Sequence, residues 1–186
     1  SNVIDMGYMF SNCRSLTSVD LNDFNTYNVT SMYAMFQNCR SLTSITFGLY
    51  GDISKVTTHS YMFNGLPSNG TLTYNCIYSD AWNKLLVTNS GSTYFPSTWV
   101  ATCELSEITN KIKFIENGVE LSEGNFIVNG VQCVYNSEEQ IWEVTHVVEQ
   151  KEYDIIFNGE VIDTLNVLKN INYVFIGNNN DSYFFH

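Results

Sequence analysis

The strongest constraint on the fold is a segment that the chain repeats almost letter for letter. Residues 11–18 read SNCRSLTS and residues 37–44 read QNCRSLTS, a spacing of 26 residues. The similarity extends to further apolar positions, which correspond as Met6 with Met32, Leu16 with Leu42, and Leu21 with Phe47. A weaker third copy follows 27 residues later, at 56–74. Similarity at a fixed period of this length is typical of chains that stack one structural unit upon another.

The spacing of apolar residues changes within each copy. The first apolar positions recur with the spacing of one helix face: Val29, Met32, Met35 and Phe36. The later positions follow the pattern L-x-x-L-x-L and end in strand-like alternation: Leu42, Ile45 and Phe47. The pattern therefore predicts a short helical turn followed by a strand in every copy, which is the shape of a leucine-rich repeat. Because one copy alone cannot bury its apolar face, we expect about three coils to stack into a short solenoid.

The run NVTSMYAMFQNCRSLTSITF resembles the BspA-like leucine-rich repeats of bacterial surface proteins, and this resemblance covers residues 2–74. The stretches NGTLTYNCIYSDAWNKLL and YFPSTW resemble the way such arrays end, with a last strand, a short helix and a Pro-x-x-Trp. A cap is therefore expected up to about residue 100. The resemblance implies adhesion and binding of host proteins, without catalysis.

The charge distribution divides the chain into two parts. Residues 1–101 carry four basic against five acidic side chains, a balance of −1, whereas residues 102–186 carry four against fourteen, a balance of −10. We therefore predict capped repeats over 1–100 and an acidic domain over 101–186. The acidic balance disfavours nucleic acid and anionic membranes as partners. No run of 18 apolar residues is present, so no membrane-spanning segment is expected.

The second part is predicted to be a small β domain. Strand-like runs occur at 111–115, 125–128, 131–135, 141–144, 153–157 and 173–176. Asn-Gly pairs at 117–118, 129–130 and 158–159 separate several of them, and this dipeptide is a strong signal for a tight hairpin. The expected fold class is thus α+β and rich in β: a leucine-rich-repeat solenoid with a cap, followed by an antiparallel β-sandwich of immunoglobulin-like or similar type.

The five cysteines show no zinc-binding spacing, since no C-x-x-C occurs. We expect Cys13 and Cys39 to be buried thiols at equivalent positions, with a disulfide between them or a reactive thiol as alternatives. Cys133 and His146 are a candidate pair for thiol catalysis, but packing or solvent exposure explains both and no nucleophile motif accompanies them. Asn178–Ser182 offers oxygens for calcium, but the spaced acidic pattern of an EF-hand is missing and a plain turn is the favoured interpretation. We expect no enzyme activity, no cofactor and no metal.

The repeat register predicts a polar surface. If the alternate apolar residues of each strand point inward, the residues between them point outward. The outward set is Ser18, Asp20, Asn22, Ser44, Thr46, Gly48, Thr71, Thr73 and Asn75. Arg14 and Arg40 occupy a second column, and Tyr8, Tyr33 and Tyr61, taken as one repeat column, form a third. These residues are the candidate partner-binding surface, and the alternative is a merely solvated sheet.

Together these features predict a non-enzymatic bacterial protein, secreted or at the cell surface, that binds a host or extracellular protein through the repeat face in the manner of an adhesin. The acidic β domain would be a spacer or a second binding module. The alternative function is a glycan-binding surface module, in which Trp142, Tyr135 or Tyr153 would stack on sugar rings.

Overall fold

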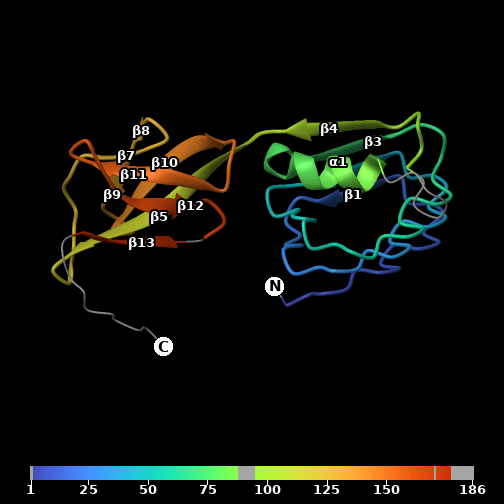
Figure 1. Ribbon diagram of the computed structural model, residues 1–186, viewed down its shortest axis with the longest axis horizontal. Coiled ribbons are helices and arrows are strands. Elements are labelled where there is room, and N and C mark those ends of the chain that lie inside the picture. The colour runs from blue at the N-terminus through green and yellow to red at the C-terminus, as the bar shows by residue number, and fades with distance from the viewer. Residues whose placement is uncertain (1, 88–94, 170, 177–186) are drawn as a thin grey trace. The chain divides into compact units, whose positions relative to one another are not determined.

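The structure is a computed structural model that describes residues 2–87, 95–169 and 171–176 (Figure 1). The chain forms two compact units, Ser1–Ser106 and Glu107–His186. The boundary between the two units lies shortly after the last strand of the first unit, which ends at Glu104.

The first unit is built on a four-stranded parallel sheet. Its strands lie in chain order: β1 (Ser18–Leu21), β2 (Ser44–Phe47), β3 (Thr71–Asn75) and β4 (Val100–Glu104). The register pairs equivalent residues of the sequence copies, so that Val19 faces Ile45 and Ile45 faces Leu72. A short 3-10 turn, η1 (Cys76–Tyr78), and the helix α1 (Ser79–Val87) connect β3 to the segment that leads into β4.

The segments predicted as short helices are series of tight turns, and this corrects the predicted fold class. In the second copy, the amides of Met35, Gln37 and Cys39 bond to carbonyls three residues back, whereas the residues between them donate to the neighbouring copy. Ala34 and Asn38 have positive φ angles of 52° and 59°, which a right-handed helix cannot contain. The chain is therefore mostly β with one short α-helix among its described residues, and it is not a leucine-rich-repeat solenoid.

Aromatic side chains stack through the core of the first unit. Phe36 lies between Phe10 and Phe63, with ring centroids 5.6 and 6.2 Å away, and Phe95 continues the row 5.0 Å beyond Phe63. The short helix expected after the last strand of the repeats is confirmed as α1, which buries Trp82 against the sheet. The Trp82 ring lies 4.8 Å from Phe47 and 5.4 Å from Tyr74. Burial of such large rings is the main source of stability for a unit of this size.

A disulfide joins Cys76, just after β3, to Cys103 in β4, with Cα atoms 4.8 Å apart. That distance equals the separation of neighbouring strands in a sheet, so the bond fits the strand pairing. Cys39 is buried, as expected, and its thiol donates a hydrogen bond to the Phe10 carbonyl at 3.0 Å. Cys13 is an exposed free thiol, so the expectation that it is buried was wrong.

The second unit contains two sheets. Its strands are β5 (Ser106–Glu116), β6 (Val119–Glu120), β7 (Phe126–Val128), β8 (Val131–Gln132), β9 (Val134–Asn136), β10 (Ile141–Val148), β11 (Glu152–Phe157), β12 (Glu160–Asn166) and β13 (Ile171–Ile176). One sheet has the order β13-β5-β10-β9 with β6 beside β5, and the other has the order β12-β11-β7-β8. Because β13 pairs with β5 in parallel, the predicted purely antiparallel sandwich is also corrected.

The three Asn-Gly hairpins are confirmed. They connect β5 to β6, β7 to β8, and β11 to β12, and each pair of strands is antiparallel. In all three turns both residues have positive φ, as a two-residue turn matched to strand twist requires. Asparagine and glycine adopt this left-handed conformation at low cost, which is why the dipeptide predicted these turns correctly.

Candidate functional site

The exposed face of the β1–β4 sheet brings most of the predicted polar residues together. Strand pairing aligns two rows across the sheet. The first row is Ser18, Ser44, Thr71 and Val100, and the second is Asp20, Thr46, Thr73 and Thr102. Since parallel strands lie about 4.8 Å apart, each row spans about 14 Å. Small hydroxyl side chains thus form most of a flat surface, which we call the polar sheet face.

Exposure varies across the polar sheet face. Ser18, Asp20 and Thr71 are exposed, whereas Ser44, Thr46 and Thr73 are half-buried by their neighbours. Asn22 is exposed just after β1, and its backbone N–H donates to the Asp20 carboxylate at 2.9 Å. A Cβ at Gly48 would lie 2.7 Å from the Asn22 carbonyl oxygen. The close approach of the two chain segments therefore requires glycine at this position.

Asn75 does not belong to the exposed surface, contrary to the prediction from the register. It is buried, its Oδ1 accepts the N–H of Ile77 at 3.1 Å, and its Nδ2 donates to the Ser106 hydroxyl at 2.8 Å. The side chain thus begins η1 and fixes the end of β3. Its polar groups are satisfied within the unit and offer nothing to a partner.

The two predicted arginines lie in equivalent turns beside the sheet. Arg14 and Arg40 are exposed, and no salt bridge to either is formed by the residues that the structure describes. Each follows closely on a left-handed asparagine, Asn12 or Asn38, and the Asn38 amide donates to the Asn12 side-chain oxygen at 3.2 Å. The repeat of this turn fixes the arginines at equivalent positions, where their guanidinium groups can meet an acidic partner.

The three tyrosines form a ladder, although they are not one repeat column. Tyr8 and Tyr61 are equivalent, but Tyr33 occupies the position of Gly7. The rings still contact one another, with centroids 5.3 Å apart for Tyr8 and Tyr33 and 5.7 Å for Tyr33 and Tyr61. Tyr8 is 60 % exposed and Tyr61 is 38 % exposed. The ladder therefore combines internal packing with a partly exposed aromatic edge.

Sequence reasoning missed β4 and its disulfide. Residues 100–104 lie at the predicted domain boundary and show no copy of the repeated motif, so nothing marked them as a fourth strand. A usable signal was the spacing of Cys76 and Cys103, which is 27 residues and equals one repeat period. Cys103 lies in β4 and Cys76 follows β3 directly, so a spacing near one period brings the two thiols within bonding reach.

The aromatic residues considered for glycan binding do not form an exposed platform. Trp142 is buried and its Nε1 donates to the Leu121 carbonyl at 2.8 Å. Tyr153 is buried and its hydroxyl accepts the N–H of Glu149 at 2.6 Å. Tyr135 is half-buried, with its ring 5.4 Å from Trp142. These rings pack within the second unit and are not available to stack on a sugar.

The candidate catalytic groups are held in unreactive states. Burial raises the pKa of the Cys133 thiol to about 12, so the thiolate is not available near neutral pH. Burial also lowers the pKa of His146, whose Nε2 pairs with Asn110 Oδ1 at 2.9 Å. No hydrogen bond joins the two residues, and the described part of the chain holds no cluster of three metal-ligating side chains. The loop Asn178–Ser182 lies outside the described residues.

The buried histidine predicts a pH dependence for the second unit. Its pKa in the folded state lies below the ordinary value of 6.5, so the unfolded chain takes up a proton first as the pH falls. The contribution of neutral His146 to the free energy of unfolding is therefore fully present above pH 6.5, and it is lost as the pH falls below that value. Urea midpoints at pH 7.5 and about pH 5.5 should differ less in His146→Gln than in the wild type. An unchanged difference in this variant would contradict the prediction. The midpoint is followed for the second unit alone, because burial also lowers the pKa of His59 in the first unit.

Residues 1–74 match the model of a family described as "Mycoplasma protein of unknown function, DUF285". The match covers the sequence copies of the first unit and does not confirm the BspA-like leucine-rich repeats. Comparison with curated proteins and with solved structures found no match. Among the described residues, no helix combines the length and the apolar character that crossing a bilayer requires.

Proposed function

We propose that this chain is a non-enzymatic bacterial protein, secreted or displayed at the cell surface, that binds an extracellular protein through the polar sheet face. The observation that supports this proposal is the alignment of two rows of side chains, all polar except Val100, across four paired strands. Hydroxyl groups on short side chains form directional hydrogen bonds and lose little rotamer freedom on binding. A rigid sheet holds them in place before the partner arrives, which lowers the entropic cost of association.

The area of the face indicates how far the contact must extend. A strand of four residues is about 13 Å long, so four strands cover roughly 180 Å². A stable interface buries about 800 Å² on each partner. A partner of ordinary affinity therefore has to reach beyond the sheet, and the exposed Arg14 and Arg40 turns are candidates for its rim. Arginine is well suited to this role because it pairs with carboxylates in a bidentate manner.

The disulfide supports a location outside the cytoplasm. Structural disulfides persist in oxidising compartments and on cell surfaces, and they are rare where the cytosol keeps thiols reduced. The bond joins Cys76, just after β3, to Cys103 in β4, which is a structural role. The match of residues 1–74 to a family of mycoplasma proteins agrees with a bacterial surface protein.

The proposal is tested by placing a large charged side chain on the polar sheet face. Thr71 is exposed in β3, between β2 and β4, and Thr164 is an exposed threonine of β12 in the second unit. The purified chain is tested against a panel of extracellular matrix and host-surface proteins and against a glycan array. We expect saturable binding to a protein that Thr71→Arg weakens at least tenfold and Thr164→Arg leaves unchanged.

Two results would overturn this function. Binding to glycans without any protein ligand would favour the glycan-binding module instead. Equal protein binding by Thr71→Arg and the wild type would place the contact elsewhere. Circular dichroism of both variants is the control for folding, because each substitution lies on an exposed strand position and leaves the core unchanged.

A further inference from the structure

Arg14 and Arg40 are the only arginines of the chain, and the repeat holds them at equivalent positions of neighbouring turns. Backbone hydrogen bonds join the two copies both before and after the arginines. The amide and carbonyl pairs are Asn12 with Gln37 at 2.7 Å and Thr43 with Thr17 at 2.9 Å. Because neighbouring strands lie about 4.8 Å apart, the Cα atoms of the two arginines are held at roughly one strand spacing.

The exposure of this column is a property of the turn itself. Arg40 lies in the middle copy, which has another copy on either side, and it is still exposed. Each arginine is followed by an exposed serine, whose hydroxyl has no hydrogen-bond partner among the residues that the structure describes. Each turn thus presents one guanidinium group and one hydroxyl. We call these four side chains the arginine ridge: Arg14, Ser15, Arg40 and Ser41.

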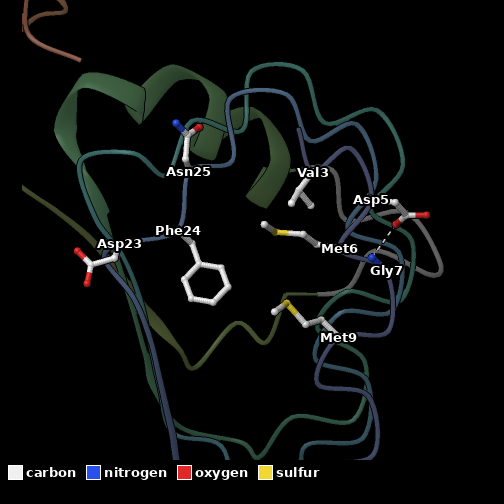
Figure 2. A pocket seen from close by; sticks show the side chains of 8 residues that line it. All are labelled: Val3, Asp5, Met6, Gly7, Met9, Asp23, Phe24 and Asn25. Atoms are coloured by element: carbon white, nitrogen blue, oxygen red, sulfur yellow. Dashed lines mark hydrogen bonds between the residues drawn. The ribbon is translucent and has the colours of Figure 1, made fainter. Parts of the chain in front are cut away.

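The carboxylates of the first unit do not neutralise the arginine ridge. Three of its five aspartates accept the backbone N–H of the residue two positions further along the chain. They are Asp5 with Gly7 at 2.7 Å, Asp20 with Asn22 at 2.9 Å, and Asp52 with Ser54 at 2.8 Å, and Figure 2 shows the first of these bonds. No carboxylate of a described residue forms a salt bridge with either arginine. Two like charges at neighbouring positions repel one another, so the ridge is suited to an anionic ligand.

We propose that the arginine ridge binds a pair of carboxylates in an acidic segment of the extracellular protein partner. Each guanidinium donates two parallel N–H bonds to one carboxylate, and each serine hydroxyl donates to an oxygen of the same segment. Two acidic residues at positions i and i+2 of an extended segment lie on one face, roughly 7 Å apart, a separation that two long arginine side chains can match. The proposal rests on the proposed function for the kind of partner, and it adds the chemistry that the rim of the polar sheet face recognises.

The charge of the chain favours a short acidic segment over a dense polyanion. Sulfated polysaccharides and nucleic acids carry many closely spaced charges, and proteins hold them with clusters of lysine and arginine. The ridge offers two cations, and the whole chain has a formal net charge of −11. Two guanidinium groups neutralise two carboxylates, whereas the remaining charges of a polyanion would be unpaired at the ridge and repelled by the chain.

The test follows the arginines themselves by nuclear magnetic resonance. A chain with two arginines gives two Nε–Hε signals, which Arg14→Lys and Arg40→Lys assign. The full ¹⁵N-labelled chain is titrated with the blocked peptide Ser-Glu-Ser-Glu-Ser at about pH 6.5, where glutamate is ionised. We expect both signals to shift together and to saturate, with weak affinity because exposed ion pairs are individually weak. The control peptide Ser-Gln-Ser-Gln-Ser should shift neither signal.

Variants distinguish the guanidinium fork from general electrostatic attraction. Arg40→Gln should weaken binding of the glutamate peptide at least tenfold, and Arg40→Lys at least threefold, because an ammonium group cannot form two parallel bonds with a carboxylate. Lys84→Gln removes the same charge from an exposed position of α1 and is the matched control, for which the affinity should change less than twofold. The melting temperature of Arg40→Gln should equal or exceed that of the wild type, since the substitution removes the repulsion between the arginines.

Several results would overturn this proposal. Shifts of both signals with a heparin tetrasaccharide, but not with the glutamate peptide, would favour a sulfated glycan. Equal shifts with the glutamine peptide, or equal affinity of Arg40→Gln and the wild type, would also refute it. A protein ligand that Thr71→Arg weakens, but that Arg40→Gln binds like the wild type, would leave the proposed function standing and refute the carboxylate site. Peptide binding at the ridge without any protein ligand in the panel would support the site and count against the proposed function.

Discussion

Replacement of both Cys76 and Cys103 by serine lowers the free energy of unfolding of the first unit by roughly 3 to 4 kcal/mol. The disulfide closes a segment of 27 residues, and opening it releases the unfolded chain from that constraint. The disulfide is also important for keeping β4 paired with β3, because all five residues of β4 are exposed. Burial of side chains therefore contributes little to the position of β4, which depends mainly on backbone pairing with β3 and on the disulfide.

The loss of stability is measured by urea unfolding of the full chain. Hydrogen-exchange mass spectrometry is the readout, and peptides from residues 2–87 report on the first unit. A reducing agent should lower the midpoint of the wild type by the same amount and leave the double variant unchanged. Cys13→Ser, at an exposed free thiol, is the matched control and should have no effect. Thiol titration of the denatured, unreduced protein should detect three thiols, and detection of five would show that the disulfide does not form.

Leu42→Ala should destabilise the first unit by about 2 to 5 kcal/mol, within the range measured for buried leucines. Leu42 is fully buried in the core, so its removal leaves a cavity that neighbouring rings cannot fill without moving. Leu16 is its equivalent in the first copy but is only partly buried. Leu16→Ala should therefore cost about half as much or less.

This pair of variants compares the same residue type at the same repeat position, so the difference between them reports burial alone. The urea midpoint of the first unit is the measurement, with the slope of the transition as a check that the unfolded states are comparable. Equal destabilisation by the two substitutions would contradict the partial burial of Leu16. An unchanged midpoint for Leu42→Ala would contradict the register of the sheet.

Much of the strand structure could be predicted, because it depends on local chemistry. The Asn-Gly turns fixed three hairpins, since both residues tolerate positive φ. Val19, Ile45 and Leu72 are equivalent positions of the three copies and lie side by side in the sheet. The same correspondence places Ser18, Ser44 and Thr71 in one row. These features need only the period of the sequence and the two faces of a strand.

The helical turns were predicted wrongly for a physical reason. Apolar residues three or four apart fit one helix face, but they also fit a series of tight turns in which alternate amides leave the segment. A signal for the second arrangement was present at Asn12, Asn38 and Gly65, which are equivalent and all have positive φ. Two asparagines and a glycine in one column indicate a left-handed position that would end a helix.

The limits of the site prediction have a different origin. Asn75 follows the outward alternation of β3, but its side chain turns to begin η1 and becomes buried. The fourth strand pairs across a segment that contains α1, and no local pattern in Val100–Glu104 identifies its neighbour. Pairing between distant segments depends on the packing of the whole unit, and a single sequence does not display that packing.

The position of the disulfide also determines how the first unit responds to mechanical load. Tension applied to the chain beyond residue 103 reaches a covalent bond at Cys103 and passes directly to Cys76 at the end of β3. The segment between the two cysteines, which contains η1 and α1, is bypassed and carries no force. The segment with η1 and α1 would thus stay over the core under tension, because the covalent route is far stronger than the hydrogen bonds of one exposed strand.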